Sequence, residues 1–273
     1  MTDAPRLKAA ILDWAGTVVD HGSRAPMGAF VRAFAELGVA ISVADARGPM
    51  GMAKWDHINA VGRSPNVAAA WRAKHGRDFG NADVDAIFDV FEPMNVAAIK
   101  DHADIIPGAL AAIADMRRRG MKIGSTTGYT RPIMAELAPI AAKAGYVPDV
   151  TVCAGDLPEG RPSPLMMWHA MAALGAWPAE TVVKVDDTPP GIGEGVNAGT
   201  WTVGLALTGN IAGFSAEELA ALAESDRAAI RARATKEMRD AGADFVIDSI
   251  ATLPAVLDEI EGRLAAGKQP GGK

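Results

Sequence analysis

Short apolar segments alternate with amphipathic segments along most of this chain, and this alternation restricts the fold more than any other feature. Strands are predicted at 8–12, 121–126, 149–154, 181–185, 200–207 and 244–248. Helices are predicted between and after them, at 107–120, 130–145, 163–175 and 252–264. Continuous apolar strands that alternate with helices are typical of a parallel sheet covered on both faces. The sequence therefore predicts an α/β protein with a Rossmann-like, doubly wound sheet.

One long stretch after the first strand breaks this alternation, because only helical patterns occur there. Ser23 is predicted to cap a helix that carries Phe30 and Phe34 on its apolar face, which suits a protein interior or an interface. Further helices are predicted at 53–61, 67–75 and 82–102. We predict an all-helical cap domain at 22–103, inserted into a core formed by 1–21 and 104–273. Such an insert lies over the crevice where open α/β sheets bind ligands.

The composition narrows the class of protein. Hydrophobic residues make up 49% of the 273 residues, which is enough for a sizeable core. A net charge of −6 argues against a general nucleic-acid or membrane binder, and no apolar run has membrane-spanning length. The single cysteine, Cys153, cannot form an intrachain disulfide and favours a reducing compartment. We therefore expect a cytoplasmic protein.

Acidic side chains stand at the predicted ends of two strands. The stretch ILDWAGT ends the first strand with Asp13, and VVKVDDTPPG ends the fourth strand with Asp186 and Asp187. Paired carboxylates at a strand end suit a hard cation such as Mg²⁺, which prefers oxygen ligands. A single acid at this position is often only part of a turn, so the prediction depends on this acid occurring together with the motifs at the other strand ends.

Hydroxyl groups and a cation stand at two other predicted strand ends. The stretch GSTTGYTR offers Thr126 and Thr127 just before a helix, where hydroxyls and free N–H groups bind an anion. Thr130 alone would explain the same stretch as a helix cap. In EGRPSP, Arg161 precedes two prolines that fix the backbone, and a rigidly held cation stabilises charge on a transferring phosphoryl group. An ordinary surface arginine is the alternative.

Together these four stretches resemble the haloacid dehalogenase superfamily of phosphotransferases across the whole predicted core. The resemblance implies that Asp13 attacks phosphorus and becomes an aspartyl phosphate. It implies that Arg161 balances the charge and that Thr127, or its neighbour Thr126, binds the phosphoryl group. It also implies a magnesium ion, held by Asp13, Asp187 and the backbone carbonyl of Ala15.

Two positions depart from the superfamily pattern. Ala15 stands where most members have an acid that protonates the leaving oxygen, so the chain is either inactive or has a leaving group that needs no acid there. Gly191 stands where a second metal-site acid is usual. Either Asp186 has taken over that role or water fills the place, and the sequence leaves this open.

The predicted cap suggests a reason for Ala15. Lys54 and His57 are three residues apart and share one face of a predicted helix. A lysine amine can condense with an aldehyde to an iminium, which is an electron sink and lets a P–C bond break without a leaving-group acid. The lysine must then be neutral, which requires a pKa about 2 to 3 units below its usual ~10.4. A solvated lysine and a packed histidine are the ordinary alternatives.

The motifs DWAGT, RGPMGMAKWDH, KIGSTTGYTR, EGRPSP and NAGTWTVG resemble the phosphonoacetaldehyde hydrolase, or phosphonatase, family. The resemblance implies that Lys54 forms the Schiff base and that Met50, His57 and Tyr129 match residues near the reacting groups. It implies hydrolysis of phosphonoacetaldehyde to acetaldehyde and phosphate during degradation of 2-aminoethylphosphonate. Members of the family are homodimers joined through their caps, so we expect a homodimer.

Three other functions compete with this interpretation. The first is an ordinary phosphate-monoester phosphatase of the same fold, which Ala15 and Lys54 argue against. The second is a Schiff-base aldolase, whose activity would survive loss of Asp13. The third is a module that binds phosphonates without turnover and without magnesium.

Overall fold

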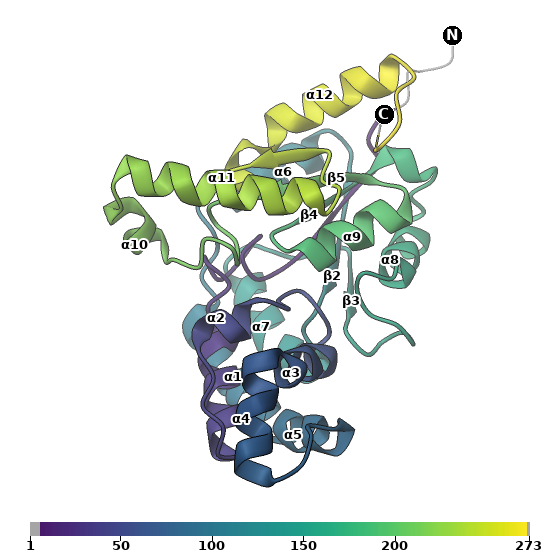
Figure 1. Cartoon of the computed structure of the whole chain (residues 1–273). Coiled ribbons are helices and arrows are strands. Elements are labelled where there is room, and N and C mark those ends of the chain that lie inside the picture. Colours follow the sequence, from purple (N-terminus) through teal and green to yellow (C-terminus); the bar gives the residue numbers. More distant parts are fainter. Residues whose placement is uncertain (1–5, 272–273) are drawn as a thin grey trace.

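The computed structural model describes residues 6–271 and contains a six-stranded sheet in which every pair of neighbouring strands is parallel (Figure 1). The strands are β1 (Ala9–Leu12), β2 (Lys122–Thr127), β3 (Val150–Cys153), β4 (Val182–Asp186), β5 (Trp201–Leu205) and β6 (Phe245–Ile247). Their order in the sheet is β3-β2-β1-β4-β5-β6. The predicted parallel α/β fold and all six predicted strands are thus confirmed.

Helices cover both faces of this sheet. The helices on one face are α6 (Ala109–Arg118), α7 (Arg131–Lys143) and α12 (Leu253–Ala265), and those on the other are α8 (Leu165–Leu174), α9 (Pro189–Ala198) and α11 (Glu224–Asp240). Strand β1 illustrates the reason. Side chains alternate across a strand. Ala10 and Leu12 therefore pack in the hydrophobic cluster on the α6, α7 and α12 face, and Ala9 and Ile11 pack in the cluster on the α8 face. Strand β1 is buried on both sides and has the wholly apolar sequence AAIL.

Four helices lie outside the predicted set, and the sequences of two of them show the reason. They are α2 (Val43–Arg47), α9, α10 (Ala216–Ala221) and α11. Helix α11 is highly polar and buries only Ala234 and Met238, so it has no apolar stripe. Helix α9 has the sequence PPGIGEGVNA, whose prolines and glycines usually interrupt helices. Its prolines stand in the first turn, where proline is tolerated.

Between β1 and α6 the chain forms a helical unit with its own hydrophobic centre, drawn in purple to blue in Figure 1. It contains α1 (Ala25–Glu36), α2, α3 (Lys54–Arg63), α4 (Pro65–His75), α5 (Asn81–Ala98) and the 3₁₀ helix η1 (Ile99–His102). Phe30 and Phe34 are fully buried in this centre, together with Trp71 and Phe91. The apolar face of the first helix is therefore an interior surface.

The predicted cap of that first helix is wrong. Ser23 has a left-handed backbone with a φ of 49° and is not the residue that caps α1. Instead the carboxylate of Asp20 accepts hydrogen bonds from the backbone N–H groups of Arg24, at 3.0 Å, and Ala25, at 2.9 Å. These bonds satisfy donors that a helix start leaves unpaired, where the chain crosses from the core.

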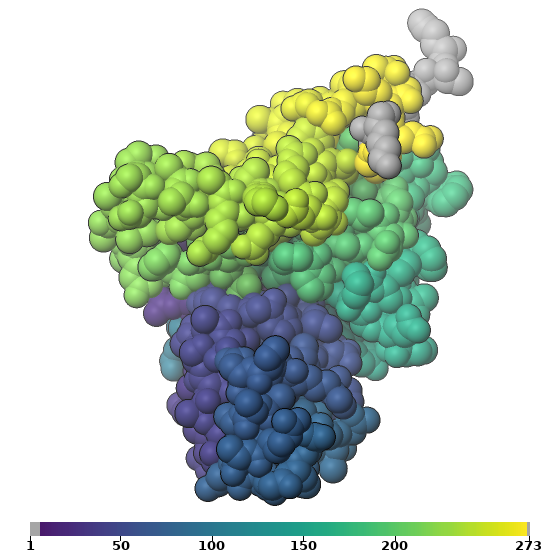
Figure 2. All heavy atoms as spheres, viewed as in Figure 1, coloured from purple at the N-terminus to yellow at the C-terminus, as the bar shows by residue number. Residues whose placement is uncertain are grey.

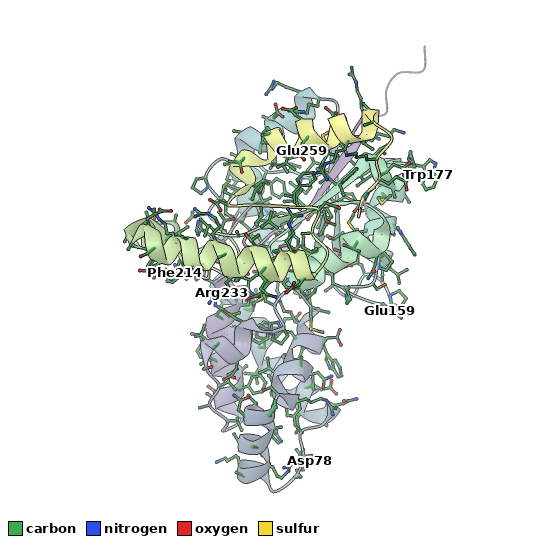
Figure 3. The ribbon with its side chains drawn as sticks, turned by 45° about the horizontal axis from the view of Figure 1, so that its top comes forward. Asp78, Glu159, Trp177, Phe214, Arg233 and Glu259 are labelled. Carbon is green, nitrogen blue, oxygen red and sulfur yellow. The ribbon has the colours of Figure 1, made fainter. Side chains whose placement is uncertain are left out.

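The helical unit packs closely against the carboxyl end of the sheet, and Figure 2 shows its atoms in contact with those of the core. Asp78 marks the far tip of this unit, and Glu259 on α12 lies toward the opposite end of the molecule (Figure 3). The limits 22–103 for a cap domain stay a prediction, and residues 1–5 and 272–273 of the predicted core lie outside the described residues. Within 6–271, no helix combines the length and the apolar character that crossing a membrane requires.

Candidate active site

The strand order brings the predicted reactive residues together. Strand β1 lies between β2 and β4, so the chain leaves β1 at a point where the strand order reverses direction. Leu12 is in register with Ser125 on one side and Val185 on the other. The next residue, Asp13, therefore lies between the ends of β2 and β4. Ligands of open α/β sheets bind in this type of crevice.

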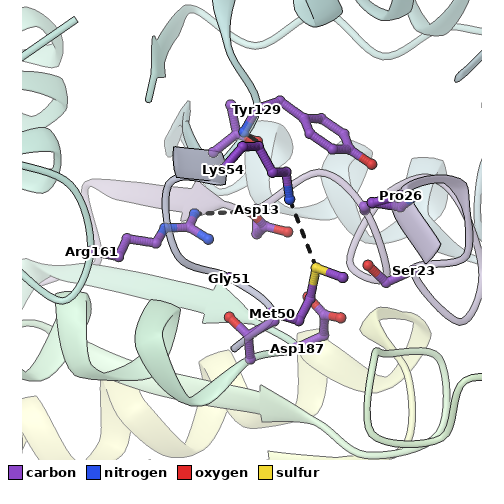
Figure 4. A pocket seen from close by; sticks show the side chains of 13 residues that line it. Asp13, Ser23, Pro26, Met50, Gly51, Lys54, Tyr129, Arg161 and Asp187 are labelled. Carbon is purple, nitrogen blue, oxygen red and sulfur yellow. Dashed lines mark hydrogen bonds and ion pairs between the residues drawn. The ribbon is translucent and has the colours of Figure 1, made fainter. Parts of the chain in front are cut away.

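A small cavity lies at this point, between the sheet and the helical unit, with about 290 Å³ of space not filled by protein atoms (Figure 4). Its lining includes eight residues that the sequence singles out: Asp13, Ala15, Met50, Lys54, Thr127, Tyr129, Arg161 and Asp187. The cavity thus has a core wall and a cap wall. His57 is not part of the lining and lies buried within the helical unit.

Asp13 and Arg161 form a buried ion pair on the core wall. Arg161 Nη2 lies 2.8 Å from Asp13 Oδ1, and a dashed line in Figure 4 marks this contact. Burial, and after it the charge of Asp186, raises the pKa of Asp13 from 3.8 to about 6, against the opposing effect of Arg161. Burial alone would lower the pKa of Arg161, but the surrounding carboxylates outweigh burial and raise it. The guanidinium is therefore permanently charged.

Glu194 holds Arg161 in place and Lys184 pairs with the same carboxylate, and sequence reasoning missed both residues. Glu194 on α9 accepts a hydrogen bond from Arg161 Nε at 3.1 Å, and Lys184 in the middle of β4 lies 3.1 Å from the same carboxylate. Lys184 also lies 3.1 Å from Asp186. The signal was present, because a lysine inside the apolar run VVKV must be paired when the strand is buried on both faces.

The structure separates the two threonines that the sequence left as alternatives. The hydroxyl of Thr126 donates to Glu194 Oε2 at 2.8 Å and accepts from Lys184 Nζ at 2.6 Å, so the charge network uses it fully. The hydroxyl of Thr127 lines the cavity and accepts a hydrogen bond from the backbone N–H of Tyr129 at 3.1 Å. Only Thr127 keeps its hydroxyl proton for a ligand.

Three carboxylates converge beside the cavity in an arrangement that suits a hard divalent cation. Asp13, Asp186 and Asp187 each offer an oxygen, and these atoms lie within 4.8 Å of one another. Burial, followed by the charges of Asp13 and Asp186, raises the pKa of Asp187 well above its usual value. Among the described residues, Asp187 Oδ1 has no hydrogen-bond partner although it is buried. A cation would relieve both the repulsion and the unpaired oxygen.

Gly191 and Asp186 share one volume, which bears on the missing acid. A Cβ atom added to Gly191 would overlap the carboxylate of Asp186. Residue 191 must therefore stay glycine while Asp186 points this way. The carboxylate of Asp186 stands where a side chain from α9 would begin, held through Oδ1 by the hydroxyl of Thr188 at 2.7 Å. Arg161 and Lys184 lower the pKa of Asp186 despite its burial, so this acid is ionised.

The cap wall presents one amine in apolar surroundings. Lys54, at the start of α3, is only 3% exposed, and its Nζ lies 3.8 Å from Met50 Sδ (Figure 4). The same nitrogen lies 5.7 Å from the ring centre of Phe30 and 5.2 Å from that of Tyr129. Burial lowers the pKa of Lys54 from 10.5 to about 8, although Asp13 opposes this. A substantial fraction of the amine is therefore neutral near pH 8.

His57 supports this wall from behind. Its Nε2 lies 2.7 Å from the carbonyl oxygen of Ala46 and must donate the proton, since a carbonyl only accepts. Its ring packs on Phe30 with 4.0 Å between the ring centres. Burial, and after it the charge of Lys54, lowers the pKa of His57 from 6.5 to about 3, so the ring is neutral. Its Nδ1 has no hydrogen-bond partner within residues 6–271.

Comparison with known proteins gives a consistent picture. The family model of the haloacid dehalogenase-like hydrolases matches residues 7–199. Phosphonoacetaldehyde hydrolase of Paraburkholderia phytofirmans is 51% identical over 264 residues, covering 97% of this chain and 99% of the relative. The protein of the same name from Aeromonas hydrophila is 48% identical, covering 97% and 95%. The crystal structure of a phosphonoacetaldehyde hydrolase like protein from Oleispira antarctica matches with a TM-score of 0.96 at 37% identity, covering 98% and 97%.

Proposed function

Because this chain belongs to the phosphonoacetaldehyde hydrolase family of haloacid dehalogenase-like hydrolases, we propose that it hydrolyses the P–C bond of phosphonoacetaldehyde to acetaldehyde and phosphate. One observation carries the proposal. A buried amine with a lowered pKa, Lys54, faces a carboxylate and guanidinium pair, Asp13 and Arg161, across one small cavity. An aldehyde whose adjacent carbon carries a phosphonate group needs both walls at once.

The reaction begins on the cap wall. The neutral amine of Lys54 attacks the aldehyde carbon, and loss of one water gives an iminium. The apolar surroundings formed by Met50, Phe30 and Tyr129 favour the neutral amine. The neutral His57, whose Nε2–H is tied to Ala46, keeps the first turn of α3 against α2 and adds no charge near the amine.

The core wall then breaks the P–C bond. A carboxylate oxygen of Asp13 attacks phosphorus while the electron pair of the P–C bond moves to carbon and into the iminium, which becomes an enamine. Arg161 is placed to balance the charge on the transferring group, and the Thr127 hydroxyl to donate to one of its oxygens. Protonation of the enamine and hydrolysis of the imine release acetaldehyde, and a second water releases phosphate from Asp13.

We propose Mg²⁺ as the cation of this site, held by Asp13, Asp187 and the carbonyl of Ala15, with Asp186 as the further acid. When bound, this ion supplies positive charge that neutralises the phosphonate oxygens and the attacking carboxylate. The hard oxygen donors and the unpaired Oδ1 of Asp187 support the choice.

The proposed chemistry also explains Ala15. A carbon leaves as part of an enamine, so no oxygen needs a proton from a neighbour of Asp13. An acid at position 15 would also add a fourth carboxylate beside Asp13, Asp186 and Asp187, which already repel one another.

The experiment compares phosphate release from phosphonoacetaldehyde and from p-nitrophenyl phosphate, in the wild-type protein and in the Lys54→Met variant. We expect rapid release from the phosphonate only, and its loss in the variant. Faster release from the phosphate ester, unaffected by Lys54→Met, would identify a phosphate-monoester phosphatase. Turnover that survives Asp13→Ala would identify an aldolase, and binding without turnover a binding module. The homodimer and the cytoplasmic location stay predictions.

A further inference from the structure

Arg47, the last residue of α2, is a half-buried cation that leaves the helical unit and enters a loop of the core. Its Nη1 donates to the carbonyl oxygen of Asn210 at 3.0 Å and to Asn210 Oδ1 at 3.1 Å. Its Nη2 donates to the carbonyl oxygen of Gly213 at 3.3 Å. In return, Asn210 Nδ2 donates to the carbonyl oxygen of Arg47 at 3.3 Å. Arg47 and Asn210 therefore each donate hydrogen bonds to the other across the boundary between cap and core. We call this reciprocal pair of contacts the clasp.

The same loop also holds a metal-site acid. The backbone N–H of Asn210 donates to Asp187 Oδ2 at 2.7 Å, and Oδ1 of this carboxylate has no hydrogen-bond partner in the described part of the chain. The loop is close to both neighbours, because a Cβ on Gly209 would overlap Asp187 and one on Gly213 would crowd the Arg47 guanidinium. Phe214, which follows this loop, lies beside the junction of the two parts (Figure 3). A shift of the loop would thus move both contacts.

On the cap side, Arg47 is followed by the short segment that leads to Lys54. This segment lies flat against the core, since a Cβ on Gly51 would overlap the hydroxyl of Thr188 and one on Gly128 would crowd the carbonyl of Met52. Helix α3 begins at Lys54 directly after it. The guanidinium of Arg47 therefore anchors the beginning of the segment whose end carries the reactive amine.

We propose that Arg47 is a positioning residue that links the cap lysine to the metal acid through Asn210. With the clasp formed, Lys54 and Asp187 are set by one shared loop; without it, each can shift independently of the other. This inference rests on the proposed function, because it gives Lys54 and Asp187 their roles. Coupling between two sites is reciprocal, so a cation at Asp187 favours the ordered Lys54 segment and an imine on Lys54 favours the cation.

Acetaldehyde is the probe that isolates this link, since it has no phosphoryl group to touch the metal. The protein is incubated with acetaldehyde and cyanoborohydride, with and without Mg²⁺, and the two-carbon adduct on Lys54 is quantified by mass spectrometry. Mg²⁺ affinity is measured separately by calorimetry. We expect Mg²⁺ to raise the rate of Lys54 trapping in the wild-type protein.

The variants Arg47→Ala and Asn210→Ala test the clasp, and Asn210→Ala keeps the backbone donor to Asp187. We expect Arg47→Ala to weaken Mg²⁺ binding by less than the about 10- to 100-fold loss that follows removal of a direct outer partner of a metal ligand, because Arg47 acts through Asn210. Arg47→Ala should also abolish the part of the Mg²⁺-dependent increase in the Lys54 trapping rate that depends on the contacts between Arg47 and Asn210. The two substitutions together should cost less than the sum of the single ones, because they break one unit.

Two control variants separate this role from general weakening of the cap. Glu92→Ala removes another bond between cap and core, the 2.7 Å contact of Thr130 Oγ1 with Glu92, which touches no reacting residue. Arg63→Ala removes an exposed cap arginine whose Nε donates to Asn59. Both should keep wild-type Mg²⁺ affinity and the wild-type Mg²⁺ effect on trapping. Free guanidinium should partly restore the Mg²⁺ affinity of Arg47→Ala and leave both controls unchanged.

The outcomes distinguish the two proposals. No Lys54 adduct in the wild-type protein would overturn the proposed function itself. A normal wild-type adduct, with Arg47→Ala and Asn210→Ala both showing the wild-type Mg²⁺ affinity and Mg²⁺ effect, would overturn the link alone. Equal losses in Arg47→Ala and Glu92→Ala would also overturn it, since any weakening of the boundary would then suffice.

Discussion

The two walls of the cavity differ in their electrostatic surroundings. The core wall is crowded with charge, since Asp13, Asp186 and Asp187 lie next to Arg161 and Lys184. The cap wall contains one ionisable amine, Lys54, among sulfur and aromatic groups. On the core side, ion pairs keep Asp186 ionised despite burial, whereas on the cap side burial, followed by the charge of Arg161, lowers the pKa of an amine. The nucleophile of each wall is thus prepared by the surroundings that suit it.

The largest expected effect is a loss of phosphate release, which depends on the core wall, without a loss of adduct formation on the cap wall. Asp13→Asn should lower phosphate release by about 10⁴-fold or more, as removal of a nucleophile commonly does. The same variant should still form the acetaldehyde adduct on Lys54, because the amine does not need the carboxylate. Phosphate assays and adduct mapping on one preparation check both statements. Loss of the adduct in Asp13→Asn would show that the walls are not separable.

The second effect concerns stability. The lowered pKa of Lys54, about 8 instead of 10.5, means that burying this amine in its charged form costs about 3 kcal/mol. Lys54→Met keeps a flexible apolar side chain of similar length, so it should raise the free energy of unfolding at pH 7 by up to about 3 kcal/mol. The gain should be complete below pH 8 and should vanish as the pH approaches 10.5, where the amine is neutral in both states. Urea denaturation at pH 7 and pH 10 measures it, and equal gains at both pH values would contradict it.

A third prediction tests the shared volume of Asp186 and residue 191. Asp186→Gly should weaken Mg²⁺ binding by about 10- to 100-fold, and Gly191→Asp alone should be destabilising because its side chain overlaps Asp186. The double variant should recover most of the affinity, since one carboxylate again fills the space. Calorimetric titration with Mg²⁺ follows all three. A double variant as weak as Asp186→Gly would mean that Asp186 serves only to anchor Arg161 and Lys184.

The pH dependence should differ between the walls by smaller factors. Trapping of acetaldehyde on Lys54 needs only the neutral amine, so its rate should rise about tenfold per pH unit up to about pH 8 and then level off. Phosphate release at limiting Mg²⁺ should fall further below about pH 6, where Asp13 becomes protonated. Initial rates between pH 5 and pH 10 give both profiles. A trapping rate that still rises above pH 10 would place Lys54 in water.

The core wall could be predicted from sequence more fully than the cap wall. Carboxyl ends of parallel strands meet at one edge, so Asp13, Thr127 and Asp187 were expected together once the strands were recognised. Glu194 was not expected, because it stands in a glycine-rich helix, whereas Lys184 was overlooked although its place inside an apolar strand signals a buried ion pair. Whether Asp186 stands in for an acid at 191 depends on a volume that appears only after folding.

On the cap side, spacing alone placed Lys54 and His57 on one helical face, but it did not say which reaches the cavity. The structure puts only Lys54 there, because the His57 ring is tied to Ala46 and packed on Phe30. Sequence reasoning also attributed the start of α1 to Ser23, whereas Asp20 reaches across the turn to cap it. The contacts of His57 join separate helices and leave no local pattern in the sequence, whereas the cap from Asp20 is local and comes only three residues before the position that was chosen.

The most direct measurement is reductive trapping with the true substrate. The protein is incubated with phosphonoacetaldehyde and Mg²⁺, treated with borohydride, and digested for peptide mapping, while released phosphate is measured before trapping. We predict a two-carbon adduct on Lys54 and on no other lysine, together with phosphate, because the iminium must persist after the P–C bond has broken. Rapid phosphate release with an unmodified Lys54 would contradict the division of labour between the two walls.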